Sequence, residues 1–230
     1  PKFYEEPAAQ PVKQGKADLS SYVAIDGSIG AGFMDGALYN GTDYGQKYSY
    51  PELLANQLKL ANSALVFNSP LVNSEIGWTG TITGNINVGK TQLVTPACNT
   101  VSISPVAQKS DLTDIAKFEG DKSLLNNFSI PFLSVKDVDV AAGFTSTNGN
   151  PTNYAKNVLD PGTSLASAVK KKNAKFFTIW LGYHDALNFA TSGGTKIPVS
   201  ESEFEQKLDL LLDSLLATEG AAGVIGTIPY

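Results

Sequence analysis

Two residues of this sequence stand where a hydrolytic site could form. Ser28 lies in the glycine-rich run DGSIGAG, directly after the short apolar segment 22–25. His184, the only histidine of the chain, follows the apolar run 176–182. A serine hydroxyl is a weak nucleophile that needs a neighbouring base, and an imidazole is a common base. The two residues are therefore candidates for the nucleophile and the base of a serine hydrolase.

Both candidates follow predicted strands. The segment 22–25 is β-rich, and FFTIWLG at 176–182 is apolar throughout, which is typical of a central strand buried on both faces. A further apolar run, 223–228, predicts another buried strand. In parallel sheets, sites form at the carboxyl ends of the strands. Ser28 and His184 are each expected at such an end.

Helices are predicted between these strands. In SYPELLANQLKLA, Ser49 and Glu52 have the spacing of a capping box, which predicts a helix start. The segment 150–174 predicts one or two helices, with Pro161 early in the second. Strands that alternate with helices favour a mostly parallel sheet covered by helices.

The clearest helical pattern is SESEFEQKLDLLLDSLLATEG, near the end of the sequence. Its apolar residues form one stripe, its N cap is expected at Ser200 or Ser202, and its C cap at Gly220. The predicted organisation is an extended tether over 1–20 and an α/β domain over 21–230. The Thr-, Asn- and Gly-rich texture of about 64–106 predicts β-hairpins inserted into that domain.

Composition excludes several classes of site. The net charge is −5 and all 17 basic residues are lysines, so there is no basic footprint for nucleic acid. Cys98 is the only cysteine, which excludes an internal disulfide and a cysteine-based metal site. No apolar run reaches the ~18 residues of a membrane-spanning helix. The motif GNINVGKT lacks the strand and helix of a phosphate-binding loop around it, so we expect no nucleotide. No cofactor and no metal is expected.

The segment YVAIDGSIGAGFMDGALYNGTDYGQKYSYPELLANQL resembles the first conserved block of the SGNH (GDSL) hydrolases, and is most similar to a bacterial lipoprotein branch. FFTIWLGYHDALNFATSGG resembles the third block, and LLNNFSIPFLS the second. The resemblance covers about 18–60 and 150–230 and is loose between them. It implies a three-layer α/β/α sandwich and hydrolysis of esters.

The same resemblance assigns roles to three residues. Ser28 takes the nucleophile position, Phe132 the position of an oxyanion glycine, and His184 the position of an oxyanion asparagine. The first block reads Asp26-Gly27-Ser28 where the family has glycine, then Asp or Asn, then serine. No histidine follows His184, so the family's D-x-x-H base motif is missing. We expect the domain to be incomplete at its C-terminus. Three substitutions and a missing base indicate loss of catalysis.

Three functions follow as hypotheses. The first is a degenerate SGNH-like lipoprotein, held at a bacterial outer membrane by a lipid anchor before its N-terminal tether. It would be a non-catalytic subunit of an outer-membrane protein complex. The second is an active serine esterase or lipase on acyl or acetyl esters, with its base in sequence beyond residue 230. The third is a sugar- or lipid-binding protein that keeps the old cleft as a receptor.

Overall fold

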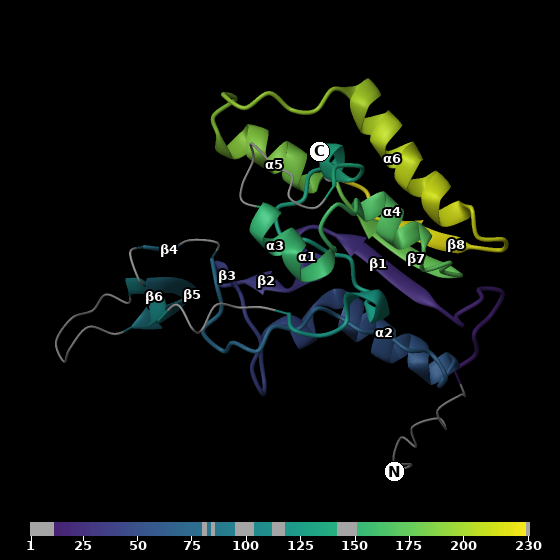
Figure 1. The fold of residues 1–230 in the computed structure, drawn as a ribbon, viewed down its shortest axis with the longest axis horizontal. Coiled ribbons are helices and arrows are strands. Elements are labelled where there is room, and N and C mark those ends of the chain that lie inside the picture. Colours follow the sequence, from purple (N-terminus) through teal and green to yellow (C-terminus); the bar gives the residue numbers. More distant parts are fainter. Residues whose placement is uncertain are drawn as a thin grey trace, which may run out of the picture.

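The computed structural model describes residues 12–79, 82–83, 86–94, 104–111, 118–141 and 151–228. Its centre is a parallel sheet with the strand order β1-β7-β8 (Figure 1). The three strands are β1 (Tyr22–Asp26), β7 (Phe176–Trp180) and β8 (Ala222–Ile225). The chain is thus a mixed α/β protein with a parallel sheet, which confirms the fold class at this level.

The two faces of the sheet carry separate apolar clusters, because side chains alternate along a strand. On β1, Tyr22 and Ala24 belong to the smaller cluster. Val23 and Ile25 point to the other face and belong to the larger one. Both clusters are needed to bury this sheet, which explains why the strand is apolar at every position before Asp26.

Helices cover both faces of the sheet. The smaller cluster is closed by α2 (Tyr50–Ala61), which contributes Ala55. The larger cluster includes residues of α3 (Pro151–Val158), α4 (Leu165–Lys170) and α6 (Glu201–Leu216). Figure 1 shows α2 on one side of β1 and β7, and α4 with α6 on the other.

The remaining described elements are short or lie at the margins. They are α1 (Ser28–Ala31), β2 (Phe33–Met34), β3 (Ala37–Leu38), β4 (Ile82–Thr83), β5 (Ile86–Val94), β6 (Ser104–Asp111), α5 (Tyr183–Thr191) and three 3₁₀ turns, η1 (Gln46–Tyr48), η3 (Lys122–Leu124) and η4 (Val135–Asp137). Two residues separate the end of β7 from the start of the helix α5.

The helix ends test the predicted caps. Ser49 is the N cap of α2, but its side chain makes no capping hydrogen bond, and the Glu52 carboxyl interacts with the Ser69 hydroxyl instead. Ser200 caps α6 as predicted, since its side chain accepts the Glu203 N–H at 3.2 Å. Helix α6 ends at Leu216, and Gly220 lies in the turn after it with φ of 73°.

Two further predictions were wrong. Pro161 does not begin the second helix of 150–174, because it lies in the turn before Ser164, the N cap of α4. The last strand is not buried: all four residues of β8 are exposed, with Val224 at 58 %. The reason is topological, since β8 lies at the edge of the parallel sheet that the described residues form, and β7 is its partner there.

The β-rich region is an antiparallel sheet in the order β4-β5-β6, running from Ile82 to Asp111. Residues before it belong to the body of the domain, because Leu65 and Trp78 are buried in the core clusters. Lys90 of the GNINVGKT motif lies inside β5, so this part of the motif is a strand rather than a phosphate-binding turn. Cys98 lies outside the described residues, as do residues 1–11 of the predicted tether.

Candidate active site

Ser28 opens α1 directly after β1, at the carboxyl end of that strand. Gly27 is the N cap of α1, and a Cβ atom added to it would lie 2.7 Å from the Tyr183 hydroxyl oxygen. At the other end of α1, Gly32 has φ of 73° and lies so close to Gln46 that a Cβ would be 2.7 Å from the Gln46 Cα atom. Glycine is therefore required at Gly32, whereas a larger residue at Gly27 would have to displace the Tyr183 hydroxyl.

A buried glutamine, Gln46, contacts the end of this turn. The Gln46 side chain is 2 % exposed and makes three hydrogen bonds. Its amide donates to the carbonyls of Ala31 and Pro70, each at 3.2 Å, and its Oε1 accepts the Val72 N–H at 2.8 Å. A polar group buried at this depth is stable because its hydrogen-bonding capacity is used. Gln46 thus links the end of α1 to a neighbouring loop.

Phe132 lies against Ser28 through its backbone. Its N–H donates a hydrogen bond to Ser28 Oγ at 3.0 Å. Its φ is 65°, a left-handed conformation that glycine adopts easily and other residues rarely do. The position therefore has the backbone expected of an oxyanion glycine, although it carries a phenyl ring. That ring packs edge-on against Phe33 at 4.9 Å between centroids.

Tyr183 contacts the start of α1 through its hydroxyl. It is the first residue of α5, and its hydroxyl oxygen accepts the Ile29 N–H at 3.1 Å. The same hydroxyl also interacts with the backbone N–H and the hydroxyl of Ser28. Burial raises the pKa of Tyr183 well above its usual value, so the phenol stays protonated. The neutral Tyr183 hydroxyl therefore accepts hydrogen bonds from N–H groups at the N-terminus of α1.

Asp26 is fully buried beside this turn, at 0 % exposure. Burial raises its pKa to about 7. Its ionised form is stabilised in part by the N–H groups of Gly27 and Gly30 and by the hydroxyls of Tyr50 and Tyr183. Desolvation outweighs these contacts, because an ionised carboxylate is costly to remove from water. This carboxyl, two residues before Ser28, therefore keeps its proton to a higher pH than an exposed aspartate does.

His184 is buried, at 6 % exposure, in the first turn of α5. Its ring lies 5.3 Å from the Phe132 ring, centroid to centroid. The structure therefore brings Ser28, Phe132 and His184 to one place, with Phe132 between the other two. Asp185 follows His184 and is also buried, and its Oδ2 accepts the Val135 N–H at 3.0 Å. This bond ties α5 to η4, and the same carboxyl also interacts with its own backbone N–H.

Sequence reasoning missed two contributors to the site. Asp26 appeared only as part of the departure Asp26-Gly27-Ser28 from the first block, and Tyr183 had no predicted role in the site. The signal for Asp26 was a carboxylate at the end of an otherwise apolar strand. Tyr183 carried no such signal, because its contact with Ile29 spans 154 positions of sequence.

Comparisons of the chain with protein-family models, with curated proteins and with solved structures find no match. Among the described residues, no group of three or more His, Cys, Asp or Glu side chains is arranged to hold a metal ion. Within the same ranges, no helix has both the length and the apolar character to cross a bilayer.

Proposed function

We propose that this chain is an SGNH-like domain of the three-layer α/β/α type that has lost ester hydrolysis and serves as a non-catalytic subunit of a larger assembly. One observation carries the loss of hydrolysis. The hydrogen-bond donors around Ser28 already have acceptors inside the protein. The Phe132 N–H donates to Ser28 Oγ, and the Ile29 N–H donates to the Tyr183 hydroxyl.

The physical argument concerns the oxyanion. Acyl transfer requires donors that are aimed at the developing negative charge and are free to bind it at about 2.7–3.1 Å. Here the Tyr183 hydroxyl oxygen lies over the start of α1, where such an oxygen would have to enter. A substrate carbonyl would have to displace Tyr183. Tyr183 is packed against the Trp180 ring at 5.9 Å, so its movement would disturb the end of β7.

The surroundings of Ser28 also disfavour a proton relay. A serine nucleophile needs a base within hydrogen-bond reach. His184, the only imidazole of the sequence, is buried, and its ring is tilted by 59° against that of Phe132. Asp26 is acidic enough to ionise near pH 7, but the Tyr183 hydroxyl interacts with both it and Ser28. The arrangement supports a structural network around the turn.

The test is hydrolysis of p-nitrophenyl acetate and p-nitrophenyl butyrate by the protein and by its Ser28→Ala variant. We expect the same rate for both proteins, at the level that any protein surface gives. A rate that disappears in Ser28→Ala would refute the loss of hydrolysis. The variant removes one hydroxyl from a half-exposed turn and with it the acceptor of the Phe132 N–H, so circular dichroism of both proteins checks that the fold is kept.

The assembly role rests on the resemblance to a lipoprotein branch and on the β4-β5-β6 sheet, which offers a docking surface. The proposed setting is a bacterial outer membrane, with a lipid anchor ahead of the N-terminal tether. Leu93 of β5 is 72 % exposed, so Leu93→Glu places a charge on this sheet without removing a strand. Loss of co-purifying membrane proteins in that variant supports docking there, and unchanged co-purification refutes it.

An active esterase is the second candidate, and one observation favours it. The Phe132 backbone has the left-handed conformation that glycine adopts easily, as expected of an oxyanion donor at this position. An esterase of this kind would take its base from further sequence. Turnover of the two esters that depends on Ser28 would establish this alternative.

A further inference from the structure

A pocket of 370 Å³ lies away from Ser28, between η3, the turn that follows α3 and the end of α4. Its volume is near the lower limit of small-molecule sites, which span about 300–1,000 Å³. The floor is apolar and part of the core: Phe128, Val158 and Leu159 are each at most 3 % exposed. Three lysines reach its rim: Lys122, Lys171 and Lys172.

The pocket and the Ser28 turn lie toward opposite ends of β1. Asn127 pairs with Ala24 in parallel, so the segment that contains both features runs beside β1 in the same direction. Phe132 therefore lies toward the carboxyl end of β1, and Lys122 toward its amino end. The pocket is thus distinct from the candidate active site.

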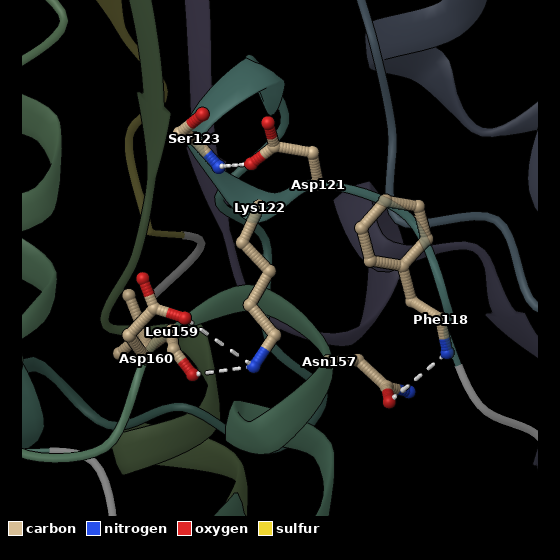
Figure 2. A network of polar contacts seen from close by, with 7 residues as sticks. All are labelled: Phe118, Asp121, Lys122, Ser123, Asn157, Leu159 and Asp160. Atoms are coloured by element: carbon tan, nitrogen blue, oxygen red, sulfur yellow. Dashed lines mark hydrogen bonds and ion pairs between the residues drawn. The ribbon is translucent and has the colours of Figure 1, made fainter.

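Two of the lysines cross the pocket in opposite directions. Lys122, from η3, donates to the Leu159 carbonyl at 3.1 Å on the far wall, as Figure 2 shows. Lys172, after α4, donates to the Ser123 carbonyl at 2.8 Å on the η3 wall. Each ammonium has three N–H donors. Main-chain carbonyls thus hold two cations in place and leave donors for a further acceptor.

The nearby carboxylates neutralise these cations only in part. Asp160 lies 3.8 Å from Lys122 Nζ and its side chain is 68 % exposed. Asp121 is exposed, and its Oδ1 accepts the Ser123 N–H at 2.8 Å (Figure 2). Burial lowers the pKa of Lys172, and Asp121 opposes this shift only in part. Three ammonium groups and two carboxylates give this part of the surface a net charge of +1. One of the cations, Lys172, is partly removed from water.

We propose that this pocket binds a monocarboxylate with a short alkyl chain, such as a medium-chain fatty acid. The carboxylate would lie among the three lysines, and the chain on Phe128, Val158 and Leu159. A single excess charge matches a monoanion, and lysines bind it as point charges, without the planar fork that arginine offers to phosphate. The apolar floor requires the chain.

The test is isothermal titration calorimetry of the protein with sodium octanoate, octan-1-ol and inorganic phosphate. We expect saturable binding of octanoate at one site, with binding of the other two at least about tenfold weaker. Absence of octanoate binding would overturn the proposal. Phosphate or octanol binding as tight as that of octanoate would also overturn it, because charge and chain would then not both be required.

Lysine-to-glutamate variants test where octanoate binds. Lys171 is exposed and its ammonium bonds no group in the described parts of the chain, so Lys171→Glu spares the two crossing bonds. Lys196→Glu makes the same change at an exposed site elsewhere. We expect octanoate to bind about tenfold more weakly to Lys171→Glu than to Lys196→Glu. Equal binding would refute this location. Ser28→Ala should bind octanoate like the wild type, so binding that depends on Ser28 would place the acid in the active site instead.

Discussion

Phe132 holds a backbone conformation that suits glycine, and the energetic consequence can be measured with a pair of variants. Phe132→Ala and Phe132→Gly both remove the ring and its contacts with Phe33 and His184. The two variants therefore lose the same packing energy. They differ by a single Cβ atom at a residue whose φ is 65°. Their difference in stability isolates the cost of that conformation.

The magnitude follows from two opposing effects. An L-residue in the left-handed region costs about 1–2 kcal/mol, and glycine avoids this cost. Replacing glycine by alanine stabilises a protein by about 0.4–1 kcal/mol where the backbone is compatible, because it restricts the unfolded chain. The first effect is larger at this residue. We therefore expect Phe132→Gly to be more stable than Phe132→Ala by about 1 kcal/mol, or about 2–4 °C in Tm for a chain of this length.

The assay is urea-induced unfolding of both variants, followed by circular dichroism. We expect a higher midpoint for Phe132→Gly at an unchanged slope. Phe33 is a matched control, because it is also a partly buried aromatic residue of the same cluster, without a positive φ. There, Ala should be the more stable replacement. Equal stability of the two Phe132 variants, or a more stable Phe132→Ala, would refute the assignment of a glycine-type backbone.

Three further predictions concern the polar residues around the turn. The folded pKa of Asp26 is about 7 against 3.8 for the free side chain, so the folded protein binds the extra proton and stability falls as pH rises from about 4 to 7. Unfolding free energies across this range should drop by about 3–4 kcal/mol more in the wild type than in Asp26→Asn, and parallel curves would contradict this. Gln46→Ala should lower the unfolding free energy by about 3 kcal/mol, because it leaves the Val72 N–H and two carbonyls without partners. Urea titrations measure this loss. A loss below about 1 kcal/mol would show that water replaces the side chain. Tyr183→Phe should cost about 1 kcal/mol and speed hydrogen exchange at the Ile29 amide, and unchanged exchange would argue against that bond.

Local patterns were sufficient for the central elements of the fold. The apolar runs predicted β1 and β7, and the apolar stripe with Ser200 predicted α6 and its N cap. Burial was less predictable. The segment around Val224 is apolar enough for a central strand, yet β8 lies at an edge, and strand order depends on contacts between distant segments.

The candidate site was predictable in position more than in chemistry. Resemblance placed Ser28, Phe132 and His184 in one site, and the structure brings these residues together. The hydroxyl of Tyr183 and the carboxyl of Asp26 were missed as members of that site. Their roles arise from a contact between the ends of β1 and β7, which no local pattern of either segment encodes.

The measurement that tests the central claim most directly is labelling of the native protein by a fluorophosphonate, with the modified residue located by mass spectrometry. Such a reagent needs a nucleophilic serine and free oxyanion donors. The N–H groups at this turn already bond Ser28 Oγ and the Tyr183 hydroxyl. We therefore predict that the native protein is labelled no more than Ser28→Ala and that no label is found on Ser28. Stoichiometric label on Ser28 would contradict the account and establish the protein as a working serine hydrolase.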